Sequence, residues 1–176
     1  MKIEYEVKIL DINVGKFQKK LESLWAEYLW EEVQKRYVYD FNPVDPNKWI
    51  RLRQKWTKTT LTVKEIIDDS ITWTKEVEIM VWDFEDTNSI LKELWYIAKA
   101  FQENKRISYK LDWVEIEIDF WPMIPAYVEV EWQNENDVDK TLEKLWYSID
   151  DTTSMNTNKV YDKYWIDLSS IKDLRF

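Results

Sequence analysis

The chain has 176 residues, with 34 acidic and 25 basic side chains and neither cysteine nor histidine. These absences exclude disulfides, thiolate nucleophiles, histidine general bases and the common zinc sites, so any metal must be held by oxygen. A net charge of -9 argues against non-specific binding to nucleic acid, and no apolar run approaches the roughly 18 residues of a membrane span. We expect one domain, residues 1–176, in a cytoplasmic protein without a membrane segment.

The predicted elements alternate between strands and short helices. Strand patterns are expected at 4–8, 35–41, 49–54, 59–65, 74–81, 98–111, 114–120 and 126–131, and helices at 14–29, 87–94, 135–145 and 154–164. Asp86 or Thr87 is the expected cap of the second helix, and Asp112-Trp113 marks a hairpin turn. About eight strands and three or four helices predict an α+β fold, an eight-stranded antiparallel β-barrel with helices packed outside.

Charged residues alternate with apolar ones in most of these strands. Glu4, Glu6 and Lys8 share one face of the first strand, because alternate side chains of a strand point the same way. The pattern recurs at Arg51 and Arg53 and in four later strands. In an open sheet such faces would be solvated, whereas in a barrel they would line a channel, and their repetition favours the channel. Strands rich in carboxylates and strands rich in Lys or Arg would then surround one cavity, which suits a polyanion held with divalent cations.

Tryptophan and glycine occur in abnormal numbers. The chain has twelve tryptophans and one glycine, although glycine normally supplies about 7% of residues. Three predicted helices end at Trp25, Trp95 and Trp146, where a left-handed glycine is usual. Trp113 follows Asp112 where Asp-Gly would form a type I′ hairpin. Others fall at strand ends or turns, namely Trp56, Trp73, Trp82, Trp132 and Trp165, with Trp30 a weaker member.

We therefore hypothesise that about ten of these positions are glycine in the natural, bacterial protein. A UGA codon, which some bacterial lineages read as glycine and other codes read as tryptophan, would account for the exchange. The alternative is a tryptophan-rich core or stacking surface, which leaves the helix-end placement unexplained. Only Trp49 and Trp121 look like ordinary tryptophans.

The segment Glu4-Tyr5-Glu6-Val7-Lys8 resembles the ExExK signature of the CYTH superfamily, the triphosphate tunnel metalloenzymes. These include thiamine triphosphatases, inorganic triphosphatases and class IV adenylate cyclases. Further residues follow in the family's order along nearly the whole chain: Arg51, Arg53, Lys64, Arg106, Asp119, Glu129, Glu131 and Lys159. The resemblance implies an eight-stranded tunnel and a divalent-metal-dependent reaction on a triphosphate.

The resemblance also implies residue roles. The cations expected to bind the phosphates are Lys8, Arg51, Arg53, Lys64, Arg106 and Lys159. The carboxylates expected on the metal side, for Mg²⁺ or Mn²⁺, are Glu4, Glu6, Asp119, Glu129 and Glu131. Lys8, Arg53 and Glu131 are the expected catalytic residues, with a metal-activated water as nucleophile in place of any histidine chemistry. No role is assigned to Glu76, Glu78, Glu115 or Glu117; Lys35 is expected to be solvated, and Arg36 is left open between solvent and tunnel mouth.

Three functions are compatible with these features. The favoured one is a metal-dependent phosphohydrolase acting on inorganic tripolyphosphate or a small organic triphosphate. A class IV adenylate cyclase, converting ATP to cyclic AMP, is the alternative, although such cyclases carry a His-Phe pair and this chain has no histidine. A non-catalytic polyphosphate- or nucleotide-binding module is third, because buried carboxylates help an anion binder only if they hold metal. We expect a triphosphate-containing small molecule as ligand, no nucleic-acid or membrane partner, and a monomer or homodimer.

Overall fold

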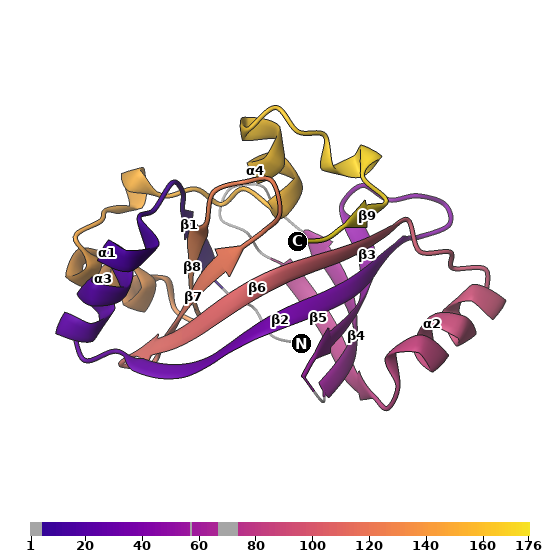
Figure 1. Cartoon of the computed structure of the whole chain (residues 1–176), viewed down its shortest axis with the longest axis horizontal. Coiled ribbons are helices and arrows are strands. Elements are labelled where there is room, and N and C mark those ends of the chain that lie inside the picture. The colour runs from indigo at the N-terminus through magenta and orange to yellow at the C-terminus, as the bar shows by residue number, and fades with distance from the viewer. Residues whose placement is uncertain (1–4, 57, 67–73) are drawn as a thin grey trace.

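The computed structural model describes residues 5–56, 58–66 and 74–176. Its strands are β1 (Tyr5–Ile9), β2 (Glu27–Asp40), β3 (Lys48–Lys55), β4 (Lys58–Ile66), β5 (Thr74–Val81), β6 (Ala100–Leu111), β7 (Val114–Phe120), β8 (Tyr127–Trp132) and β9 (Asp173–Leu174). The first eight pair antiparallel in the order β1-β8-β7-β6-β2-β3-β4-β5, and β9 adds a short parallel pairing to β6. The predicted α+β fold with eight antiparallel strands is confirmed. In the described part of the chain β1 and β5 are not hydrogen-bonded to each other, so the sheet is a curled half-barrel (Figure 1).

The helices are α1 (Val14–Ser23), α2 (Phe84–Glu93), α3 (Glu135–Leu145) and α4 (Thr157–Lys163), with 3-10 turns η1 (Ile149–Asp151) and η2 (Leu168–Ser170). Each α-helix begins at an Asn or Asp whose side chain accepts a hydrogen bond from a backbone N–H of the first turn. The predicted helix at 14–29 is too long, because the backbone becomes left-handed at Trp25 and then enters β2. The cap of α2 is Asp83 rather than Asp86 or Thr87, so this helix starts earlier than predicted.

Apolar cores fix α1, α2 and α3 to the outside of the sheet. Phe17 and Leu21 of α1 pack with Leu142 of α3 against the apolar side of β1, β7 and β8. Phe84 and Leu91 of α2 pack against β2 and β3 in a separate core. In Figure 1, α1 and α3 lie at one end of the sheet, α2 at the other, and α4 beside the strand edge near β9. Because the apolar side chains face the helices, the alternating charged side chains are left to the inner face.

The strand register aligns these charged positions in rows across the sheet. Glu131 of β8 is paired with Glu6 of β1 on one side and with Glu115 of β7 on the other. The adjacent row joins Lys8, Glu129 and Glu117 in the same way. On the other half of the sheet, Arg36 of β2 is opposite Arg53 of β3, and Lys64 of β4 is opposite Glu76 of β5. Among the described helices none is long and apolar enough to cross a bilayer.

Candidate active site

The inner face of the curled sheet encloses a cavity of about 520 Å³, which is within the usual range for small-molecule sites. Nine of the residues predicted from the sequence line it: Glu6, Lys8, Arg51, Arg53, Lys64, Arg106, Asp119, Glu129 and Glu131. Lys159 is instead exposed on α4 and is not among the lining residues, although its neighbours Asn156 to Asn158 are. Glu4 lies outside the described residues.

One side of the cavity, here called the carboxylate wall, consists of Glu6, Glu117, Asp119, Glu129 and Glu131 with the cations Lys8 and Arg106. Arg106 donates from Nε and Nη2 to the two oxygens of Asp119 at 2.6 and 2.5 Å. Its Nη2 also lies 2.5 Å from Glu129 Oε2, and Nη1 donates to Glu117. Burial opposes the charged form of Arg106, but Asp119 and Glu129 outweigh it and raise its pKa. One guanidinium therefore organises three carboxylates from β7 and β8.

Lys8 is the second organising cation of this wall. It is 4% exposed, forms an ion pair with Glu6, and lies 3.4 Å from Glu129 Oε1. Burial would lower the pKa of Lys8, but the Glu6 and Glu129 carboxylates outweigh burial and raise it. Burial conversely favours the neutral form of Glu129, yet Lys8 and Arg106 lower its pKa to about 2. Glu129 is therefore ionised at any working pH.

The opposite side, here called the guanidinium wall, consists of Arg36, Arg51 and Arg53 on β2 and β3. The Nη2 atoms of Arg51 and Arg53 each lie 3.7 Å from the same oxygen of Glu78, which also accepts a hydrogen bond from Thr62 Oγ1 at 2.6 Å. Burial and the neighbouring Arg51 and Arg36 guanidiniums lower the pKa of Arg53 well below its usual value. Among the residues that the structure describes, one carboxylate at 3.7 Å thus serves two mostly buried guanidiniums, which leaves positive charge for an anionic ligand.

Lys64 lies between the two walls. It forms an ion pair with Glu76 on the neighbouring strand. Burial and the nearby Arg51 lower the pKa of Lys64, whereas Glu76 and Glu6 act in the opposite direction. Its position on β4 brings a third strand of the curled sheet into reach of both walls.

The donor chemistry of the carboxylate wall suits a hard divalent cation. The row Glu6, Glu131 and Glu115 places like charges on three adjacent strands, an arrangement that is unfavourable unless a cation balances it. These donors are all oxygens, the ligands that Mg²⁺ and Mn²⁺ prefer. In the ranges that the structure describes, no three acidic side chains converge into a ready-made metal site.

Several lining residues have no assigned role in the sequence prediction, which leaves Arg36 open between solvent and the tunnel mouth. Arg36, Lys55, Trp121 and Tyr127 all face the cavity. Arg36 could have been found by alternation, since positions 32, 34 and 36 share one face of β2, but the strand was recognised only from residue 35. Lys35 points to the other face, where its Nζ lies 4.7 Å from the centre of the Phe84 ring.

Comparisons with known proteins agree with this architecture. The family model for the CYTH domain matches residues 2–160. No curated protein matches the chain. A conserved hypothetical protein from Pyrococcus furiosus has a TM-score of 0.76 at 25% identity, over 88% of this chain and 97% of that one. A protein from Pyrococcus horikoshii has a TM-score of 0.77 at 22% identity, over 87% and 96%. HpAC1 from Hippeastrum, whose structure is described with a dominant triphosphatase activity, has a TM-score of 0.67 at 15% identity, over 97% and 100%.

Proposed function

Since the chain belongs to the CYTH domain family, we propose that it is a divalent-metal-dependent phosphohydrolase acting on inorganic tripolyphosphate or a small organic triphosphate. The observation that carries this proposal is the asymmetry of the cavity. Arg51 and Arg53 share one carboxylate at 3.7 Å, while across the cavity the acidic side chains outnumber Lys8 and Arg106. A linear polyanion can occupy the first region while its counter-ions occupy the second.

The guanidinium wall would bind and orient the phosphates. Bidentate guanidinium contacts are short, directional and strong when they are shielded from water. Arg53, held among other cations, gains the most from an added phosphate oxygen, and it would stabilise charge that develops on the leaving phosphate. Lys64 and Arg106 would hold the remaining phosphate oxygens from the sides.

The carboxylate wall would hold the metal and position the attacking water. Glu6, Asp119 and Glu129 are the described residues that would bind Mg²⁺ or Mn²⁺, with Glu4 as a further candidate outside the described part. The bound ion would neutralise phosphate charge and make water a better nucleophile. Glu131 would orient that water by accepting a hydrogen bond from it and would take up its proton as it attacks. Lys8 would keep Glu6 and Glu129 in place through its ion pairs.

A class IV adenylate cyclase is the second candidate, because the same phosphate-binding cations could hold ATP. It would need a pocket that holds adenine and ribose so that the 3′-hydroxyl attacks in line, and the absence of histidine removes one family feature of such cyclases. HpAC1, a putative adenylyl cyclase of similar fold, is described as having a dominant triphosphatase activity. This supports ranking the hydrolase above the cyclase.

One panel assay tests the proposal. Tripolyphosphate, ATP and thiamine triphosphate are incubated with the protein and either Mg²⁺ or Mn²⁺, and both phosphate and cyclic AMP are measured. We expect phosphate release from tripolyphosphate to exceed cyclic AMP formation from ATP with either metal. Cyclic AMP as the main product would favour the cyclase, and no turnover of any triphosphate would favour a binding module.

A further inference from the structure

Besides the Nε atoms of Arg51 and Arg53, three buried hydrogen-bond donors on the cavity surface have no acceptor within the described part of the chain. They are Arg36 Nε, Trp121 Nε1 and Tyr127 Oη, and all three residues line the cavity. Arg36 is 8% exposed, Trp121 5% and Tyr127 1%. Buried polar groups in proteins nearly always have a partner, so three orphaned donors on one cavity surface indicate a place where a ligand supplies acceptors.

The surroundings of Arg36 leave its charge without an ion pair among the described residues. Its Nη2 donates to the neutral amide oxygen of Asn104 and lies 3.5 Å from that of Gln34. The nearby carboxylate Asp119 already accepts two hydrogen bonds from Arg106. On the other side, the guanidinium carbon lies 4.7 Å from the centre of the Trp121 ring. A buried cation in such a setting is costly until an anion approaches.

We propose that Arg36, Trp121 and Tyr127 form an additional subsite for a phosphoryl group beside Arg51 and Arg53. Arg36 lies directly opposite Arg53 in the β2–β3 register, so one polyphosphate chain can reach both guanidiniums. Burial next to Arg51 and Arg106 lowers the pKa of Arg36 to about 9, so it stays charged at neutral pH. Only the identity of the ligand as a triphosphate rests on the proposed function.

Calorimetric titration of the full chain in metal-free buffer tests the subsite with tripolyphosphate, pyrophosphate and orthophosphate as probes. Arg36→Gln should weaken tripolyphosphate binding about ten- to a hundredfold and pyrophosphate binding less, because the shorter anion can be held by Arg51 and Arg53 alone. Tyr127→Phe removes one donor with little change of shape, and Trp121→Phe removes one donor together with part of the ring; each should weaken tripolyphosphate binding about threefold. Arg36→Lys should retain part of the affinity, and Arg175→Gln, at an exposed arginine, should retain all of it.

The outcomes separate the subsite from the proposed function. Wild-type affinity for tripolyphosphate in a folded Arg36→Gln protein would overturn the subsite, even if the chain hydrolyses triphosphates. Binding that depends on Arg36 in a protein that hydrolyses no triphosphate would support the subsite and overturn the hydrolase. If Arg36→Gln fails to fold, Tyr127→Phe and Trp121→Phe decide the question, and unchanged binding in both would reject the proposal.

A second inference concerns the tryptophans and rests on separate observations. All four α-helices end in the same backbone motif, with Trp25, Trp95, Trp146 and Trp165 at φ values of 59, 68, 69 and 58°. In each motif the Trp N–H donates to the carbonyl three residues earlier, and the next N–H donates to the carbonyl five residues earlier. This is the Schellman motif, whose left-handed position is normally glycine. Trp56, between β3 and β4, also has a positive φ of 41°.

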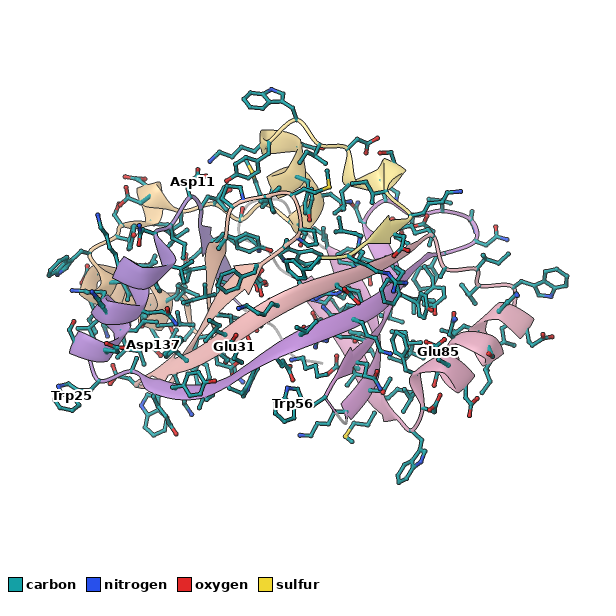
Figure 2. All side chains as sticks on the ribbon, in the orientation of Figure 1. Asp11, Trp25, Glu31, Trp56, Glu85 and Asp137 are labelled. Atoms are coloured by element: carbon teal, nitrogen blue, oxygen red, sulfur yellow. The ribbon has the colours of Figure 1, made fainter. Side chains whose placement is uncertain are left out.

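The indole side chains at these five positions are exposed to solvent and bury little surface against the protein. They are 93, 88, 83, 93 and 73% exposed at Trp25, Trp95, Trp146, Trp165 and Trp56, and Figure 2 shows the Trp25 indole projecting away from the molecule. Among these five, and within the part of the chain that the structure describes, Trp146 alone has a ring contact, with Lys20 Nζ 3.2 Å from the ring centre. By contrast Trp121 is buried, and the single glycine, Gly15, lies within α1 without a positive φ.

Not every tryptophan of the predicted set behaves this way. At the β6–β7 hairpin the positive φ belongs to Asp112, so the type I′ expectation for Trp113 is not met by the backbone. Trp82 is fully exposed without a positive φ, Trp132 packs at the edge of a core, and Trp30 lies at a β-bulge. Trp73 lies outside the described residues. The structure therefore supports the glycine hypothesis at the five positive-φ positions.

We infer that Trp25, Trp56, Trp95, Trp146 and Trp165 stand where the protein made by its natural host has glycine, through UGA codons read as glycine. The gene provides the first test: UGA is expected at these five codons and UGG at Trp121, and UGG at the five would overturn the inference. Peptide mass spectrometry of the protein from its host decides which residue a UGA codon gives, and tryptophan there would overturn it equally. In the recombinant chain, Trp25→Gly, Trp95→Gly and Trp165→Gly should each raise the melting temperature by about 2–4 °C, whereas Trp121→Gly should lower it. Lower melting temperatures for all three would show that the indoles stabilise the fold.

Discussion

The carboxylate wall and the guanidinium wall handle buried charge in opposite ways. In the carboxylate wall, Arg106 and Lys8 each contact more than one acidic side chain at close range, so both cations are paired while the carboxylates stay in excess. In the guanidinium wall, Arg51 and Arg53 share one oxygen of Glu78 at 3.7 Å, and the partners of Arg36 within the described ranges are neutral amides.

This difference indicates that the two walls have different roles in ligand binding. A network of short charge-assisted hydrogen bonds is rigid, because these bonds fix its geometry even where a net charge is left for a metal ion. A set of buried cations with too few counter-charges is instead complementary to an anion that has yet to arrive. We therefore regard the carboxylate wall as pre-organised and the guanidinium wall as completed by ligand.

Removing Arg53 should have the largest effect on this division. Arg53→Ala deletes a buried guanidinium from the wall that lacks counter-charge, and kcat/KM for tripolyphosphate should fall by about two orders of magnitude or more. Folding should be little affected, because the substitution relieves repulsion with Arg51 and Arg36. Steady-state kinetics and thermal unfolding measure the two effects, with the exposed Arg175→Ala as control. Kinetics equal to those of wild type would show that Arg53 does not bind the phosphates.

Neutralising Glu129 probes the other wall. Glu129→Gln keeps the shape and removes a charge, so the Mg²⁺ concentration for half-maximal activity should rise by about an order of magnitude, with partial recovery at higher Mn²⁺. Lys8 and Arg106 lose a shared partner, so the melting temperature should also fall. Glu143→Gln on the exposed face of α3 is the matched control. An unchanged metal dependence would place Glu129 outside the metal shell.

The smallest effect is expected from Lys55 at the end of the guanidinium wall. Burial and the charges of Arg53, Arg106 and Arg51 lower the pKa of Lys55 to about 7, with Glu32 acting in the opposite direction. Below that pH Lys55 is charged and attracts an anion; above it the attraction is lost. Tripolyphosphate should therefore bind Lys55→Met more weakly than wild type at pH 6, by up to about tenfold, and nearly equally at pH 8. Titration of both proteins at each pH cancels protonation of the ligand itself, and a constant ratio would contradict the expectation.

The sequence allowed the residues on the inner face of the sheet to be anticipated better than the residues that the helices bring to the cavity. Glu6, Lys8, Arg51 and Arg53 could be placed on one surface because strand alternation is strict and helices cover only the apolar face. Lys159 could not, because its place depends on how Tyr161 of α4 packs against Trp121, a tertiary contact without a local pattern.

Arg36 and the end of α1 show two other limits. The first half of β2 contains a bulge between Tyr28 and Trp30, which breaks the period-two pattern by which a strand is recognised. The same region looked helical because Leu24 and Tyr28 continue the apolar stripe of α1. The left-handed residue at position 25 ends that helix, which the apolar stripe alone does not reveal.

The position of Trp121 gives the cavity an optical probe of its own. Its indole is buried, stacks near the Arg36 guanidinium at 4.7 Å and has an N–H without an acceptor in the described chain. Indole emission depends on the polarity and charge around the ring, so occupancy of the neighbouring site should change its intensity or wavelength. In the recombinant chain the exposed indoles of the helix ends add a solvent-like background. Replacing them with glycine would leave a spectrum dominated by fewer rings, in which ligand binding can be followed without a label.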